Sequence, residues 1–112
     1  MYKMIAALSL AAFVAGCSKS IPDCSDDEAT DLVKQVINDN LVEKYGKDAV
    51  KNATLKILFI KTTDTDKKSG AKKCSATLNV SDSNHSAESP ITYNIDKEDD
   101  NITVAVWGID DL

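Results

Sequence analysis

The only histidine of the chain, His85, lies in a polar segment with groups that could assist a general base. Asp82, Ser83 and Ser86 are close neighbours, so a carboxylate and two hydroxyls accompany the imidazole. Nucleophilic catalysis would require the hydroxyl, the ring and the carboxylate to be aligned by hydrogen bonds. The same residue types also form turns, and their order matches no established triad signature. We therefore interpret the segment as a loop without catalytic residues, and we expect the protein not to be an enzyme.

Two acidic segments contain oxygen ligands that calcium prefers, but neither has the pattern of a calcium-binding loop. Asp64-Thr65-Asp66 precedes Ser69-Gly70, yet Lys68 stands at the third ligand position and no bidentate glutamate follows at the required offset. The acidic run from Asp96 to Asp100 lacks the glycine of such a loop. Two cysteines and one distant histidine also fall short of a tetrahedral zinc site. We expect no metal ion and no other cofactor.

The first 17 residues have the order of a secretory signal. Lys3 supplies an early positive charge, the run from Met4 to Val14 is apolar apart from one serine, and Val14-Ala15-Gly16-Cys17 follows. Small residues before a cleavage site are typical of signal peptides, and a transmembrane helix would need about 20 apolar residues. The segment resembles the signal and lipobox of bacterial lipoproteins. This resemblance implies that residues 1–16 are removed and that Cys17 becomes an acylated first residue. A plain secretory signal is the alternative.

The lipoprotein resemblance also implies a location. Cys17 would hold the chain to a membrane through its lipid, with residues 17–23 as a tether and residues 24–112 as one small domain. In this family an aspartate after the acylated cysteine commonly signals retention in the inner membrane, whereas this chain has Ser18. We therefore expect a lipid-anchored protein of the cell envelope, in the outer membrane and facing the periplasm. The cell surface is the alternative location.

If Cys17 carries lipid, the remaining thiols are Cys24 and Cys74. Export places them in an oxidising compartment, where disulfides persist, so we predict a bond between them. A closed loop of about 50 residues corresponds to roughly 4 kcal/mol in the chain-entropy model. Two free, buried cysteines are the alternative.

The charge balance restricts the partners of the domain. The net charge is −5, and removal of Lys3 with the signal leaves −6. The chain contains no arginine, the side chain best suited to bidentate contacts with phosphate. Because nucleic-acid-binding proteins have basic patches, we expect no nucleic-acid partner.

Apolar periodicity predicts one helix over residues 26–45. Ser25 and Glu28 have the spacing of a capping box, and Gly46 is a suitable helix end. The spacing of three and four residues defines a single apolar stripe, made of Ala29, Leu32, Val33, Val36, Ile37 and Leu41.

Four strands are predicted after the helix, over residues 53–63, 74–81, 91–95 and 102–107, because apolar residues there alternate with polar ones. In the first strand the alternation places Phe59 on the same side as Leu55 and Ile57. Short turns between the strands favour an antiparallel meander, and one helix on one face of it gives a two-layer α+β domain. This order of elements resembles the cystatin-like and NTF2-like arrangement and small uncharacterised lipoproteins. The resemblance is architectural and transfers no function.

Trp107 is out of phase with Val104 and Val106 in the last strand. If the helix covers the valine side, Trp107 lies on the open face, where Thr103 and Thr92 would accompany it in a binding surface. Packing at the domain edge is the alternative role of the tryptophan. The hypothesis that we favour is a membrane-anchored, non-catalytic module that binds an envelope protein, as inhibitors, immunity proteins and exclusion proteins do. The alternatives are a carrier with a cavity of roughly 300 Å³ or more between helix and sheet, and an envelope hydrolase.

Overall fold

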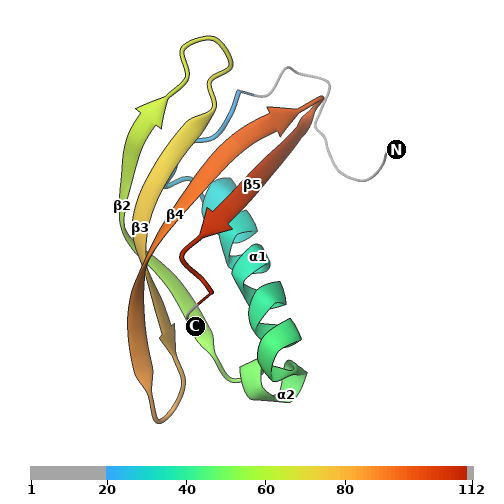
Figure 1. Ribbon diagram of the computed structural model, residues 1–112, viewed down its shortest axis with the longest axis vertical. Coiled ribbons are helices and arrows are strands. Elements are labelled where there is room, and N and C mark those ends of the chain that lie inside the picture. Colours follow the sequence, from blue (N-terminus) through green and yellow to red (C-terminus); the bar gives the residue numbers. More distant parts are fainter. Residues whose placement is uncertain (1–19, 111–112) are drawn as a thin grey trace.

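One helical segment followed by four consecutive strands forms the part of the chain that the computed structural model describes, residues 20–110 (Figure 1). The predicted signal, the lipobox and Cys17 lie outside these residues. The elements are α1 (Asp27–Tyr45), α2 (Lys47–Val50), β2 (Thr54–Thr65), β3 (Lys72–Ser81), β4 (Ser86–Glu98) and β5 (Asn101–Trp107). All neighbouring strands are antiparallel, in the order β2-β3-β4-β5, which confirms the predicted meander and α+β class.

Helix α1 has a different start from the predicted one. Asp26, not Ser25, is the N-cap residue, and its Oδ2 accepts a hydrogen bond from the backbone N–H of Asp23 at 2.9 Å. The predicted capping box is therefore wrong, because the carboxylate of Asp26 fastens the turn that leads into the helix. The helix ends at Gly46 as predicted, where a φ of 87° suits glycine and the N–H of Gly46 reaches the carbonyl of Val42 at 2.8 Å.

The core lies between α1 and one face of the sheet (Figure 1). The helix buries Ala29, Thr30, Val33, Ile37 and Leu41. The sheet buries Cys74, Ala76, Leu78, Ile91, Tyr93 and Ile95 against them. Full burial of each large apolar side chain contributes about 1.5–3 kcal/mol relative to its exposure. The helix therefore covers one face of the sheet and leaves the opposite face to solvent.

No helix within residues 20–110 is both long and apolar enough to span a bilayer.

Strand β4 is much longer than the predicted 91–95, because it begins at Ser86 and continues through Pro90. Proline lacks an N–H and is tolerated at a sheet edge. Strand β5 pairs only with Thr92–Glu98 of β4, so Pro90, which is opposite Thr77 of β3, has no neighbouring strand on its β5 side. The chain passes closely here: a Cβ on Gly108, whose φ is 94°, would lie 2.7 Å from the carbonyl oxygen of Pro90. Glycine at this position lets the chain leave β5 beside β4.

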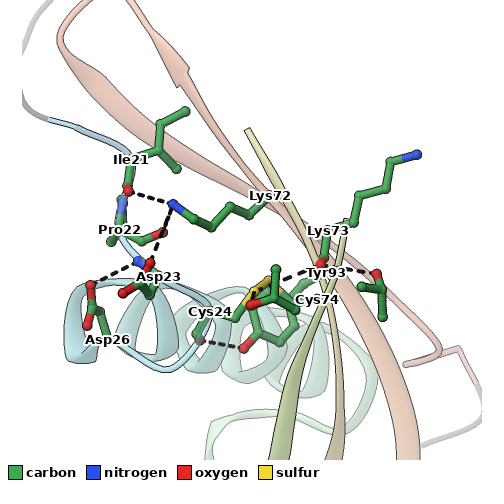
Figure 2. The surroundings of a disulfide bond; sticks show 11 residues. Ile21, Pro22, Asp23, Cys24, Asp26, Lys72, Lys73, Cys74 and Tyr93 are labelled. Carbon is green, nitrogen blue, oxygen red and sulfur yellow. Dashed lines mark hydrogen bonds and ion pairs between the residues drawn. A yellow bond between two sulfur atoms is a disulfide. The ribbon is translucent and has the colours of Figure 1, made fainter. Parts of the chain in front are cut away.

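A disulfide joins the segment before α1 to the inner face of β3 (Figure 2). It links Cys24 and Cys74, whose Cα atoms are 5.8 Å apart, and confirms the predicted pairing. Both residues are buried, and the hydroxyl of Thr62 lies 3.2 Å from Cys24 Sγ. The bond thereby fixes the start of the helix to the sheet.

Lys72 binds the chain just before this disulfide (Figure 2). Its Nζ donates to the carbonyl oxygens of Ile21 at 2.9 Å and Pro22 at 3.3 Å, and it lies 3.6 Å from Asp23 Oδ1. Ile21 and Pro22 belong to the predicted tether 17–23, yet both are buried on the domain. The chain therefore enters the fold at a fixed point, beside the turn between β2 and β3.

Tyr93 completes the same cluster from β4. Its side chain is fully buried, and its hydroxyl donates to the carbonyl oxygen of Cys24 at 2.6 Å. Burial raises the pKa of Tyr93 to about 12, because the phenolate would lose its hydration.

Tyr93→Phe should remove both the hydrogen bond to the Cys24 carbonyl and the titration of the Tyr93 phenol. Leaving the Cys24 carbonyl without its partner should lower the free energy of unfolding by about 1–2 kcal/mol at neutral pH. The unfolded phenol titrates near pH 10, so the stability that the neutral phenol contributes is present below about pH 10 and is lost as the pH rises towards 12.

A soluble form of residues 18–112 has only Tyr45 and Tyr93 as tyrosines, so tyrosinate absorbance resolves the effect. The wild type should show an ionisation step near pH 12 that the variant lacks. Equal urea stability of the two proteins, with the late step retained in Tyr93→Phe, would contradict the assignment.

Candidate binding surface

A β-bulge in β2 turns Phe59 onto the open face of the sheet. Leu58 pairs with Thr77 and Lys61 with Ser75, so three steps along β2 oppose two along β3. Phe59 occupies the bulge with a φ of 55° and is 75% exposed. The expectation that it shares the side of Leu55 and Ile57 is therefore wrong, because the extra residue reverses the alternation at this point.

A signal for the bulge was present in the sequence. Residues 57–60 form an unbroken apolar run, which strict alternation does not explain and which an extra residue in the strand accommodates. A bulky residue at positive φ is an unusual and costly conformation. Such conformations concentrate at functional sites. The exposed ring of Phe59 is therefore a candidate binding residue.

Trp107 lies on the same face at the opposite edge of the sheet. It ends β5, pairs with Thr92 of β4 and is 51% exposed. The structure thus brings together two of the three residues proposed for a binding face. Thr103 is exposed on β5 but pairs with Asp96, about 13 Å along the strand from Trp107 at the usual rise per residue.

A shallow groove of about 470 Å³ crosses the strands between these two aromatic rings. Phe59 and Lys61 stand at the β2 end, and Trp107 and Gly108 stand at the β5 end. The remaining lining comes from Ser75, Ala76, Thr77, Pro90, Ile91 and Thr92. The result is a floor with hydroxyl groups between two apolar walls. Exposed aromatic residues with neighbouring adaptable polar groups are characteristic of protein-binding surfaces.

Charge divides the open face into two halves. The outward, exposed side chains of β2 and β3 include Lys56, Lys61 and Lys73, with Asp64 as an acid beside them. The charged ones of β4 are all acidic, namely Glu88, Asp96 and Glu98. Figure 2 shows Lys73 pointing away from the buried cluster. The face is therefore basic towards β2 and acidic towards β4.

The loop around His85 has the hydrogen bonds of a turn. The carboxylate of Asp82 accepts from the backbone N–H groups of Asn84 at 2.8 Å and His85 at 2.7 Å, and these bonds lower the pKa of Asp82. The imidazole is 87% exposed, with Nδ1 3.8 Å from Asp82 Oδ1. Ser86 lies within 3.2 Å of Asn79 Nδ2. Asp82, the acid that could have oriented a catalytic histidine, thus stabilises the β3–β4 turn through these backbone hydrogen bonds.

Asp66 has the same structural role in the β2–β3 turn. It accepts from the N–H groups of Lys68 at 2.8 Å and Ser69 at 3.1 Å, which lowers its pKa. Within residues 20–110, no three histidine, cysteine, aspartate or glutamate residues form a group suited to a metal ion.

A second hollow, of about 390 Å³, lies at the end of the domain remote from Ser20. Leu41, Tyr45, Val50 and other residues of the helical segment form one wall, and residues 80–82, His85 and residues 87–89 of the β3–β4 hairpin form the other. The α2 segment and this hairpin both lie at the lower end of Figure 1. The hollow is mainly apolar, with His85 and Glu88 among the polar residues that line it.

Comparisons of the chain with protein-family models, with curated proteins and with solved structures find no match. The architecture is therefore established by the structure alone, as a helix packed on a four-stranded antiparallel sheet, and function must be argued from these surfaces.

Phe59→Asn tests whether the aromatic ring serves binding and not folding. Asparagine adopts positive φ more readily than phenylalanine, so the free energy of unfolding should stay unchanged or rise by up to about 1 kcal/mol. Urea denaturation measures this. Leu78→Ala is the matched control in the core and should cost about 2–5 kcal/mol. A comparable loss in Phe59→Asn would mean that the ring contributes to the fold.

Proposed function

We propose that the protein is a membrane-anchored lipoprotein of the cell envelope whose domain is a non-catalytic protein-binding module, of the inhibitor, immunity or exclusion type. The observation that carries the proposal is the pair of exposed aromatic rings, Phe59 and Trp107, at the two ends of one groove. A partner that covered both rings would remove from water the two most exposed large apolar side chains of the open face.

The chemistry of the groove supports a protein partner. Ser75, Thr77 and Thr92 supply hydroxyl groups between the rings, and lysines and acids surround them. Apolar anchors within a polar rim are the usual arrangement of protein interfaces. The groove runs across the open surface of the sheet, so a small molecule bound in it would remain largely exposed to water.

The entry point of the chain supports the anchor. Ile21 and Pro22 are fixed by Lys72, and Cys17 precedes Ser20 by three residues, a span of about 10 Å when fully extended. An acylated Cys17 would hold the β2–β3 turn near the bilayer. Lys67 and Lys68 in that turn are exposed and carry the charge that anionic headgroups attract.

The anchor is tested in cells that express the full chain. Labelled palmitate should be incorporated into the wild type and not into Cys17→Ser, and globomycin should cause the unprocessed precursor to accumulate. Cys24→Ser, a matched thiol change within the domain, should retain the label. A wild type without label, processed normally in globomycin, would show that the lipobox interpretation is wrong.

The binding surface is tested by site-specific photocrosslinking in the same cells. A benzophenone amino acid at Thr92, in the groove floor, should give an adduct that mass spectrometry identifies. The same group at Gln35, on the exposed side of α1, is the control and should give none. Trp107→Ala should reduce the adduct from position 92 at least about 10-fold, as loss of a hot-spot tryptophan does. The absence of any adduct from position 92 would refute the proposal.

A small-ligand carrier is the second candidate, and the hollow beside α2 is the observation that favours it. Its volume of about 390 Å³ exceeds the roughly 300 Å³ of small-molecule sites. The centre of the helix–sheet layer is filled by fully buried side chains such as Ile37, Leu78 and Tyr93, so a ligand would occupy the end of the layer and not its middle.

A further inference from the structure

The open face of one copy is complementary to the open face of a second copy in one particular relative orientation. The row Lys61, Ser75, Thr92 and Trp107 runs across all four strands, with Phe59 beside Lys61 at the β2 end. A twofold axis along the strand direction, placed above the centre of the sheet, puts the β2 edge of one copy over the β5 edge of the other. Phe59 of each copy then meets Trp107 of the other copy at the same height along the strands.

Charge selects this axis over the perpendicular one. With the axis along the strands, the basic β2–β3 half of each copy lies over the acidic β4–β5 half of the other, so Lys56 approaches Glu88. With an axis across the strands, each strand would lie over its own counterpart, so the basic half would lie over the basic half and the acidic half over the acidic half. Opposite charges across an interface favour the first arrangement, and like charges oppose the second.

We propose that the partner of the Phe59–Trp107 groove is a second copy of this chain, packed face to face about a twofold axis parallel to the strands. This inference rests on the proposed function, because it identifies the partner of the same surface. Such an interface is isologous: each copy contributes the same groove and the same two rings.

The anchor geometry agrees with this axis. A twofold parallel to the strands keeps both copies pointing in the same direction, so both β2–β3 turns and both fixed Ile21–Asp23 segments lie at one end of the dimer. Two lipid chains could then enter one bilayer. The perpendicular axis would place the segments at opposite ends, where one membrane could not hold both.

The available area indicates a weak dimer in solution. Four strands spaced about 4.8 Å apart and about ten residues long cover roughly 650 Å² of each copy, somewhat less than the roughly 800 Å² per partner of a standard interface. We therefore expect a dissociation constant on the order of 1–100 μM for the soluble domain. Anchoring both copies in one membrane would raise their effective concentration.

Sedimentation equilibrium of residues 18–112, which include every described residue, tests the inference. The wild type should shift from monomer to dimer with concentration, and Trp107→Ala should weaken association at least about 10-fold. Gln35→Ala, on the exposed side of α1 and away from the open face, is the control and should leave the equilibrium unchanged.

A charge exchange tests the orientation of the two copies in the same measurement. Lys56→Glu and Glu88→Lys should each weaken self-association, since each places like charges opposite one another. An equimolar mixture of the two variants should associate more tightly than either alone. In the mixed dimer the acid introduced at position 56 of one copy meets the lysine introduced at position 88 of the other, and the native pair remains on the other side of the axis.

Each contrary result has a separate meaning. A wild type that stays monomeric up to about 1 mM, or a dimer that neither Trp107→Ala nor the charge exchange alters, overturns the inference. If the domain is monomeric while position 92 crosslinks to a different envelope protein, the proposed function stands and only the second copy is excluded. If position 92 crosslinks to nothing, the proposed function fails as well.

Discussion

Cys24 is the point on which the arrangement of the two layers depends. Its sulfur is bonded to Cys74 on β3, its carbonyl oxygen accepts from Tyr93 on β4, and α1 begins three residues later. One residue thus ties the start of the helix to two central strands. In a domain this small the hydrophobic core alone is marginal, and a bond across 50 residues reduces the entropy of the unfolded chain. With the helix held to one face, the other face remains open.

The open face owes its character to two local departures from regular strand geometry. The bulge at Phe59 turns an aromatic ring away from the core, and Gly108 lets the chain pass close to Pro90 at the end of β5, where Trp107 is half-exposed. Both rings therefore remain exposed to water, where they contribute no burial energy to the stability of the monomer. Under the proposed function, the rings at both ends of one groove would supply the apolar contacts of the interface, and the division of charge across the sheet would set its orientation.

The two ends of the domain have different surroundings under the proposed anchoring. The β2–β3 turn, with Lys67 and Lys68, would lie near the bilayer, since Lys72 fixes the chain beside it. The hollow beside α2 and the loop of His85 would lie at the far end, exposed to the envelope space. The groove runs across the strands between these ends, where a neighbour anchored in the same membrane would reach it.

Much of the fold followed from local pattern. The three-and-four spacing in α1, the stop at Gly46 and the alternation in β3 and β5 are properties of short segments, so the sequence was sufficient to predict a helix before a four-stranded meander. The pairing of Cys24 with Cys74 followed from counting the thiols that remain if Cys17 carries lipid. The start of α1 was missed because Asp26 and Ser25 are both good caps, and only the position of Asp23 decides between them.

The sequence by itself determined the order of the elements, the buried stripe of the helix and the residue types that could anchor the chain. Tertiary structure alone decided that Phe59 faces water and that β4 extends back through Pro90. The physical reason is that a bulge changes which side of a strand faces the core, and its position depends on the pairing with β3. Pairing and burial on the sheet are non-local, so periodicity along one strand cannot reveal them.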